Sequence, residues 1–323
     1  MRAVVQDEYG EAHDVLRVAE IDPPTIGADE VLLRVHAAGV DRGVWHLMAG
    51  VPYPARLATG LRRPKTPVRG REVAGRVESV GAAVTTVHPG DEVFGICEGA
   101  FAEFAPAKAA KLVARPENVT PVQAAATTVS ALTALQALRD NAKVQAGQSV
   151  LVIGASGGVG SFAVQIAKAR GARVTGVCGT GKVDLVRELG ADDVLDYTKQ
   201  DIADGGHRYD VIIDTGGHRT VRRLRRALTP RGCVVIVGSE TGGRILGGFQ
   251  RGLWAPLMSP FVSQRLTSLV SSERQADLRE LADLAASGAI TAAIDRTFPL
   301  EQTADAIQYM QDGRVRGKVV VTI

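Results

Sequence analysis

The most specific chemical pattern in the chain is a run of glycines and small residues from position 154 to position 160, which reads GASGGVG. It follows an apolar, strand-like stretch and opens a helix-like one. Glycine lets the backbone turn tightly, so that amide N–H groups can approach a pyrophosphate at the positive end of the helix. Gly158, Gly160 and Ala163 have the G-x-G-x-x-A spacing of dinucleotide sites. We therefore expect a dinucleotide loop here rather than a glycine-rich turn without a ligand.

The next strand-like stretch indicates which dinucleotide is bound. Sites for NAD usually carry an acid at the end of this strand, where it accepts a hydrogen bond from the ribose 2′-hydroxyl. Here the chain reads CGTGK from Cys178, and the first acid, Asp184, already lies within a predicted helix. Thr180 and Lys182 suit a 2′-phosphate better, and Tyr197 could add a hydroxyl or stack near the adenosine. These residues predict NADPH rather than NADH.

Length and composition limit the classes of protein that could carry such a site. At roughly 150 residues per domain, the 323 residues predict two domains. The formal net charge of +3 is too small to indicate nucleic acid as a partner. Three widely separated cysteines favour a reducing compartment over a disulfide framework. No apolar run reaches the length of a membrane span. A cytoplasmic enzyme with a small-molecule substrate is expected.

The predicted elements fall into two textures. Residues 1 to about 120 contain short β-type runs separated by Gly, Pro and Asp. From Pro121 onward an Ala-rich helix is followed by alternating strands and helices, which is typical of a parallel, doubly wound α/β sheet. The pattern lapses for about thirty residues after Ser239, which indicates either a functional loop or an irregular connection. From about residue 272 the chain alternates again, as helix, strand, helix and a final strand.

Several longer motifs extend over nearly the whole chain. They are AAGVD from Ala37, VRGREVAGRVESVG from Val68, HPGDEVFG from His88, LGADDVLDY from Leu189 and GRVRGKVVV from Gly313. With the glycine loop, they resemble the medium-chain dehydrogenase/reductase superfamily. Within it the chain is similar to the zinc-independent quinone oxidoreductases, a branch that includes zeta-crystallin and the reticulon-interacting reductases.

The resemblance implies a specific organisation. A β-rich, GroES-like catalytic domain would comprise residues 1–120 plus about 272–323. A Rossmann NADP-binding domain would comprise about 121–271, with the active site between the two domains. The resemblance also implies a homodimer formed through the Rossmann domains. We expect the CVVIVG strand from Cys233 to be the last strand of the sheet and to lie, with the segment after it, at the interface.

Departures from the zinc-containing relatives predict that no metal is bound. Those enzymes place a cysteine where Asp41 stands and a His-Glu pair where Arg71 and Glu72 stand. An arginine is always cationic and has no lone pair to offer a metal ion. Where those enzymes carry four clustered cysteines, this chain has only Cys97.

Catalytic candidates also follow from the resemblance. Asp41 stands where quinone reductases often have an asparagine beside the nicotinamide. His46 takes the place of a tyrosine in some relatives, and its imidazole could bind a carbonyl or donate a proton. The alternative is a structural histidine packed against Trp45. The implied cofactor residues are Thr128, Ser156, Gly157, Gly158, Val159, Gly179, Thr180, Lys182, Tyr197, Thr215, Val237, Arg314, Val315 and Arg316.

These features predict a zinc-free, NADPH-dependent reductase for quinones or α,β-unsaturated carbonyls. Two alternatives stay open, namely an enoyl-thioester reductase and a dinucleotide-binding regulatory or assembly protein without turnover. Two basic stretches are not absorbed by this function. Residues 52–67 could form a basic lip over an acidic or phosphorylated substrate, or could simply be solvated. The arginine-rich helix from Arg219 to Arg231 is expected to be a surface face rather than a nucleic-acid patch.

Overall fold

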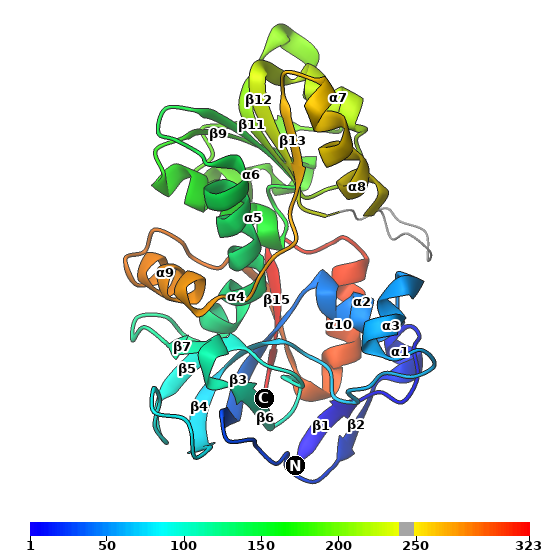
Figure 1. Ribbon diagram of the computed structural model, residues 1–323, viewed down its shortest axis with the longest axis vertical. Helices are drawn as coiled ribbons and strands as arrows, with labels where there is room; N and C mark the ends of the chain where they lie inside the picture. The colour runs from blue at the N-terminus through cyan, green and yellow to red at the C-terminus, as the bar shows by residue number, and fades with distance from the viewer. Residues whose placement is uncertain (239–248) are drawn as a thin grey trace. The chain divides into compact units, whose positions relative to one another are not determined.

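The computed structural model describes residues 1–238 and 249–323. The chain divides into two compact units, which we call unit 1 (residues 1–132 and 273–323) and unit 2 (residues 133–272). Each unit contains its own β-sheet with helices packed against it (Figure 1). The α/β class predicted from the sequence is confirmed.

Unit 2 is built on a six-stranded sheet in the order β10-β9-β8-β11-β12-β13. Every neighbouring pair is parallel. The central strands are apolar on both faces, and Val150, Leu151 and Val152 are completely buried, as expected for a parallel sheet that is covered on both sides. The strands are β8 (Ser149–Ile153), β9 (Arg173–Cys178), β10 (Asp193–Asp196), β11 (Tyr209–Asp214), β12 (Leu228–Ile236) and β13 (Arg265–Ser268).

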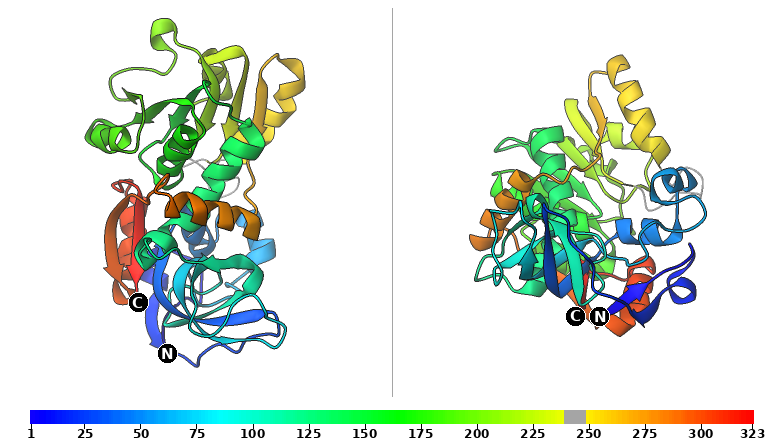
Figure 2. Two further views of the ribbon diagram at one scale, coloured as in Figure 1. Left: turned by 90° about the vertical axis from the view of Figure 1, so that its left-hand side faces the viewer. Right: turned by 60° about the horizontal axis from the view of Figure 1, so that its bottom comes forward.

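Helices cover the two faces of this sheet in different groups. Leu224 of α7 (Val221–Arg226) and Ala255 of α8 (Phe249–Met258) belong to one apolar core with Leu151. On the other face, Gly176 of β9 lies under Val186 of α6 (Val183–Glu188), which leaves no room for a side chain there. Helix α5 (Gly158–Ala169) lies on the same side as α6 (Figure 2). The result is the doubly wound arrangement predicted from the alternating pattern.

The region after Ser239 departs from the prediction. Residues 239–248 lie outside the described part of the chain, but the following residues form α8 and β13 rather than an irregular connection. The sequence pattern did not predict α8, because this helix contains Gly252 and Pro256, two residue types that disfavour a helix. β13 pairs with β12, so the CVVIVG strand is not the last strand of the sheet, as had been expected.

Unit 1 contains a seven-stranded, mostly antiparallel sheet in the order β14-β15-β3-β4-β5-β7, with β6 paired to β3. The long strand β3 (Glu30–Val40) organises this sheet, because it pairs with β4, β6 and β15. The other strands are β4 (Glu72–Val80), β5 (Glu92–Ile96), β6 (Phe104–Lys108), β7 (Leu112–Ala114), β14 (Ile294–Pro299) and β15 (Lys318–Thr322).

A separate hairpin and six helices complete unit 1. The hairpin joins β1 (Arg2–Val5) and β2 (Arg17–Glu20), and single bridges link β1 to Val68 and Ala102. The helices are α1 (Ala12–Val15), α2 (Arg42–Ala49), α3 (Arg56–Thr59), α4 (Pro121–Gln136), α9 (Gln275–Ala286) and α10 (Thr303–Gln311). The last four residues of α4 already belong to unit 2. Within the described residues, no helix has the length and apolar character needed to cross a membrane.

Candidate functional site

The glycine run forms the turn between β8 and α5. Gly154 has a φ of +79°, and a Cβ on Gly160 would lie 2.0 Å from the Gly154 carbonyl oxygen. The chain can therefore close this turn only with glycine at position 160. No side chain caps the start of α5, which follows Gly157. The amide groups and the positive end of the helix are thus left for an anionic ligand. Ser156 lies in the same turn, and Val159 lies in the first turn of α5.

The carboxyl ends of the parallel strands bring the other predicted cofactor residues to the same edge of the sheet. Gly179 follows β9, Tyr197 follows β10, Thr215 follows β11 and Val237 follows β12. We call this the nucleotide edge. It includes the place where the strand order reverses, between β8 and β11, which is where open α/β sheets bind their ligands.

Contacts within the nucleotide edge hold these residues in place. A Cβ on Gly154 would lie 2.4 Å from the Thr215 hydroxyl oxygen, which itself donates to the Ile153 carbonyl at 2.7 Å. A Cβ on Gly179 would lie 3.4 Å from the Tyr197 hydroxyl oxygen. Tyr197 is 58% exposed, so its ring can be reached by a ligand.

Asp196, at the end of β10, is a carboxylate that the sequence reasoning missed at this edge. Its Oδ2 accepts from the Thr180 hydroxyl at 2.6 Å and lies 3.4 Å from Lys199 Nζ. Its Oδ1 accepts from the Thr198 amide at 3.0 Å and the Thr198 hydroxyl at 2.7 Å. These hydrogen bonds, that from Thr180 foremost, lower the pKa of Asp196 to about 2. The carboxylate is ionised and its acceptor positions are occupied.

The Asp196 network changes what Thr180 can do. A hydroxyl carries a single proton, and that of Thr180 goes to Asp196, so in this arrangement Thr180 does not donate to a phosphate. Lys182 ends the short turn of residues 180–182 just before α6. The sequence analysis predicts that this lysine binds the 2′-phosphate, and the structure places Lys182 at the nucleotide edge.

The two catalytic candidates both lie on or next to α2 in unit 1. Asp41 is the N-cap of this helix, and its Oδ1 accepts from the Val44 amide at 2.8 Å. His46 Nδ1 lies 3.0 Å from the Val51 carbonyl oxygen, so Nδ1 carries the proton and a neutral ring leaves Nε2 as an acceptor. Burial lowers the pKa of His46. Its ring also packs against Trp45, with centroids 4.8 Å apart.

A buried ion pair next to α2 was not predicted as part of the site. Lys318 Nζ donates to Glu72 Oε2, to the Ser130 hydroxyl at 3.2 Å and to the Val40 carbonyl at 3.3 Å. Glu72 is fully buried and also accepts from the Val129 amide at 2.8 Å. Burial raises the pKa of Glu72 to about 7, against the effect of the lysine. Both residues lie in motifs quoted above for the resemblance, but nothing in the sequence pairs position 72 with position 318.

Arg71 is committed to an ion pair. Its guanidinium contacts Glu273, whose other oxygen accepts from Lys111 at 2.5 Å. The positions at which zinc relatives carry metal ligands are thus occupied here by a helix cap, an arginine paired with an acid, and an acid paired with a lysine. Among the described residues, no three His, Cys, Asp or Glu side chains gather in a way that could hold a metal ion.

The remaining predicted cofactor residues lie in unit 1. The Thr128 hydroxyl donates to the Ala125 carbonyl of its own helix at 2.8 Å. Arg314, Val315 and Arg316 lie in the turn between α10 and β15. There the Arg316 amide donates to Asp295 at 3.1 Å, and the Arg314 side chain is 71% exposed. The structure therefore assembles the predicted residues of unit 2 at one edge and places the others in unit 1.

A second buried ion pair that sequence reasoning missed supports the nucleotide edge. Asp214, the last residue of β11 and fully buried, accepts from Arg251 of α8 at 2.5 Å and from the Gly217 amide at 3.2 Å. It therefore fixes the chain on both sides of Thr215.

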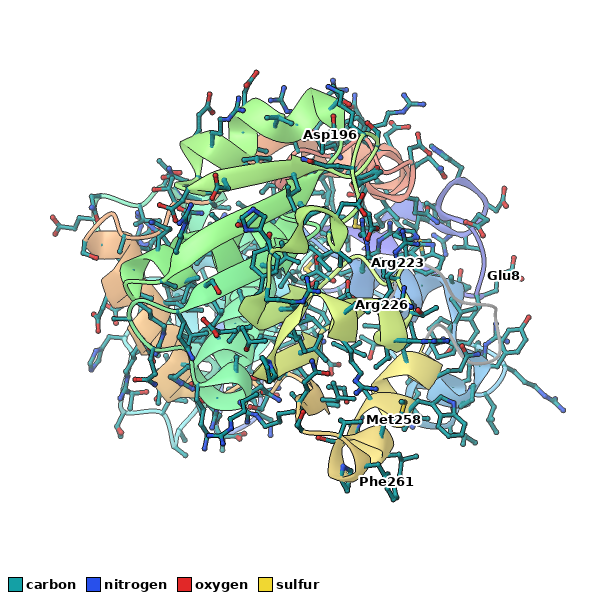
Figure 3. All side chains as sticks on the ribbon, turned by 90° about the horizontal axis from the view of Figure 1, so that it is seen from above. Glu8, Asp196, Arg223, Arg226, Met258 and Phe261 are labelled. Atoms are coloured by element: carbon teal, nitrogen blue, oxygen red, sulfur yellow. The ribbon has the colours of Figure 1, made fainter. Side chains whose placement is uncertain are left out.

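The arginine-rich helix α7 uses its charges within unit 2. Arg223 lies 2.9 Å from Asp201, and Arg225 donates to Gln264 at 2.9 Å. Figure 3 labels Arg223 and Arg226 on this helix. These internal contacts agree with a solvated structural face.

Comparisons with known proteins identify the class. A family model described as "Alcohol dehydrogenase GroES-like domain" matches residues 27–117, and one described as "Zinc-binding dehydrogenase" matches residues 189–321. The spinach chloroplast protein named quinone-oxidoreductase homolog is 31% identical, over 99% of this chain and 98% of its own. The mouse mitochondrial protein named NAD(P)H oxidoreductase RTN4IP1 is 31% identical, over 100% of this chain and 89% of its own.

A solved structure agrees with these relatives. The mycobacterial protein Rv1454c, complexed with NADPH, is 29% identical and superposes with a TM-score of 0.83 over 100% of both chains. A GroES-like unit and a parallel sheet with a nucleotide edge define an oxidoreductase enzyme. More specifically, the chain belongs to the medium-chain dehydrogenase/reductase superfamily, in its quinone oxidoreductase branch. The resemblance drawn from the motifs is confirmed.

Proposed function

We propose that this enzyme is a zinc-free, NADPH-dependent reductase that transfers hydride to a quinone or an α,β-unsaturated carbonyl compound. Unit 2 would bind the dinucleotide and unit 1 would carry the catalytic residues. The observation that carries the proposal is the nucleotide edge, where a glycine turn is left open at a helix start and the nearby carboxylate is already saturated.

The residues at this edge fit NADPH. Glycine at positions 154 and 160 lets the turn close tightly, and the uncapped amides at the start of α5 would bind the pyrophosphate. The acceptor positions of Asp196 are occupied by Thr180, Thr198 and Lys199, so it offers no free acceptor to the ribose 2′-hydroxyl of NADH. Lys182 and Tyr197 supply a cation and a hydroxyl for the 2′-phosphate of NADPH. The bound NADPH of the mycobacterial structure agrees with this choice.

The chemistry proposed for unit 1 follows from two positions at which the zinc relatives carry ligands. Arg71 has no lone pair to offer a metal ion, and the Asp41 carboxylate caps α2. Without a Lewis acid, a simple alcohol or ketone oxygen has no strong electrophile beside it. An activated C=C bond or a quinone needs less help, because its own conjugation spreads the developing negative charge. NADPH would supply the hydride, while the chain would position the substrate and provide for its proton. His46 is the candidate for that proton, and its neutral ring would have to be charged first.

The test is NADPH consumption with a panel of quinones and small enones, compared with NADH. We expect the enzyme to oxidise NADPH in the presence of these acceptors and not to oxidise alcohols with NADP⁺. Chelators should leave the rate of NADPH oxidation unchanged. If His46 donates the proton, His46→Ala lowers kcat for enones by about 10²–10⁴ and affects quinones less, because these can take protons from water. Tight NADPH binding without any turnover would instead indicate a regulatory protein. One firmly held zinc per chain would contradict the proposed chemistry.

We further propose a homodimer formed through unit 2, in the cytoplasm. β13 lies at the edge of the sheet of described strands, and Leu253, Trp254, Leu257 and Phe261 on or just after α8 are each more than 60% exposed. Figure 3 labels Met258 and Phe261 at this end of α8. Such an apolar group suits a second copy of the chain. Sedimentation should give a dimer, and Trp254→Glu combined with Phe261→Glu should give a monomer that still binds NADPH.

A further inference from the structure

Unit 1 contains an open pocket that the proposed chemistry does not use. Its volume is about 800 Å³, and it lies between the residues that follow β1 and the loop that follows α3. We call it the basic pocket. Its lining consists of Gln6, Asp7, Leu61, Arg62, Arg63, Pro64, Lys65 and Pro67.

Backbone contacts fix the loop that forms one wall of the basic pocket. The Lys65 amide donates to the Thr59 carbonyl at 2.8 Å, and the Gln6 amide donates to the Pro67 carbonyl at 2.9 Å. The Tyr9 hydroxyl donates to the Gly60 carbonyl at 2.7 Å. Gly60 has a φ of +121°, and a Cβ there would lie 2.0 Å from the Arg63 carbonyl oxygen. These hydrogen bonds and the close contact at Gly60 therefore fix the conformation of this loop.

The cations of this wall differ from a nearby arginine that serves the fold. Arg56 donates to the Gly50 carbonyl at 2.8 Å and lies over the rings of Tyr9 and Tyr53. By contrast, Arg62, Arg63 and Lys65 are exposed, and their side chains make no hydrogen bond or ion pair with any residue of the described ranges. Within the described residues, these three charges therefore take part in no intramolecular contact that stabilises the fold.

The acid in the lining of the basic pocket is already paired. Asp7, which is part of the lining, lies 2.8 Å from Arg17. Glu98, which is not part of the lining, accepts from the Thr66 hydroxyl at 3.2 Å. The pocket therefore carries an excess of positive charge, and the planar forks of two arginines suit the oxygens of a phosphate.

Gln6 also belongs to the lining of the basic pocket and connects it to α2. This residue is 1% exposed, and its amide nitrogen donates to the carbonyl oxygens of Glu8 and Met48, at 2.6 Å each. These two acceptors fix the orientation of the side chain, so Oε1 is an acceptor, and it has no partner among the described residues. Met48 lies on α2, the helix that contains His46. The pocket wall is thus fastened to the helix with the candidate catalytic residues.

We propose that the basic pocket binds the phosphate-bearing part of the substrate. The ligand class is a small organic phosphate that also carries an amide N–H or a hydroxyl, as in the phosphopantetheine portion of a coenzyme A thioester. This inference deepens the proposed function, because it selects an enoyl thioester among the activated C=C compounds that the enzyme could reduce.

The primary experiment measures binding and needs no turnover. Coenzyme A is titrated calorimetrically into the full-length protein saturated with NADP⁺, so that the nucleotide edge is already occupied. Coenzyme A should bind, and the triple variant Arg62→Ala/Arg63→Ala/Lys65→Ala should bind it at least about tenfold more weakly, the equivalent of one charge-assisted contact. Affinity should also fall with salt in the wild type and much less in the triple variant.

Matched controls separate the pocket from general charge effects. Arg76→Ala removes another exposed cation of unit 1, one that forms no ion pair with residues 1–238 or 249–323, and it should leave coenzyme A binding unchanged. Unchanged NADPH affinity in the triple variant would show that it is folded. Titration with inorganic pyrophosphate tests whether the phosphate alone accounts for binding or the amide portion adds to it. Failure of the wild type to bind coenzyme A, or equal binding by the triple variant, would overturn the proposal.

A kinetic comparison separates this inference from the proposed function. With crotonyl-coenzyme A as substrate, the triple variant should show a KM raised about tenfold or more and little change in kcat. With a small neutral enone, both constants should stay as in the wild type. If neither substrate is reduced, the proposed reaction is wrong. The calorimetric titration still tests whether the basic pocket binds coenzyme A.

Discussion

The nucleotide edge of unit 2 and the surroundings of α2 in unit 1 depend on different kinds of chemical group. The nucleotide edge consists mostly of backbone, glycine and strand ends that follow each other along the chain at regular intervals. Around α2, the decisive groups are charged side chains from distant positions, above all Glu72 and Lys318, which are 246 residues apart. The backbone geometry of the glycine turn tolerates few substitutions, but it involves residues that are close in the sequence. A buried charge instead depends on a partner that only the folded chain brings close.

The largest expected effect tests this dependence. Lys318→Ala leaves the carboxyl of Glu72 buried without its cation, and breaking a buried pair in this way costs about 3–5 kcal/mol of unfolding free energy. Replacing both residues, as Glu72→Leu with Lys318→Met, should recover most of the loss because no charge is then left unpaired. Denaturant unfolding of the single and double variants measures both values. A single variant as stable as the wild type would mean that the pair is not essential to unit 1.

The nucleotide edge should respond differently, through affinity rather than stability. Lys182→Ala should weaken NADPH binding by about 1.5–3 kcal/mol, the value of one charge-assisted contact, and leave NADH binding nearly unchanged. Thr180→Val is the matched comparison. Because the Thr180 hydroxyl donates to Asp196, this variant should reduce NADPH affinity much less than Lys182→Ala. Equal losses for NADPH and NADH in Lys182→Ala would refute the 2′-phosphate role of the lysine.

The two regions also differ in how far the sequence predicted them. The glycine run, the strand ends and the α/β alternation follow from local spacing, so the parallel sheet and the residues at its edge could be placed in advance. Helix α8 could not be placed, since Gly252 and Pro256 argue against a helix and only packing of residues such as Ala255 on the sheet overrides them. Asp196 could not be placed, because the acid that marks a dinucleotide site usually ends the second strand, here β9, whereas Asp196 ends the neighbouring strand β10.

Long-range pairs were invisible for a more general reason. Arg71 could be excluded as a metal ligand from its chemistry alone, but its pairing with Glu273 depends on the return of the chain to unit 1. The same holds for Asp214 and Arg251, and for Gln6 and Met48. Residue type indicates which chemistry is available, while tertiary contacts decide whether a charge is spent on the fold or left for a ligand.

The smallest expected effect concerns His46 and the pH dependence of stability. Burial lowers the pKa of His46 from its ordinary value of 6.5, so the unfolded chain binds this proton more tightly than the folded one. The contribution of the neutral ring is therefore complete above pH 6.5 and is lost as the pH falls through the lower pKa of the folded state. In His46→Gln the unfolding free energy should decline less on acidification than in the wild type. His207→Gln, at an exposed position, should follow the wild-type curve. NMR titration of the His46 ring gives the pKa directly, and a value above 6.5 would reverse the sign and restore a charged ring as a ready proton donor near neutral pH.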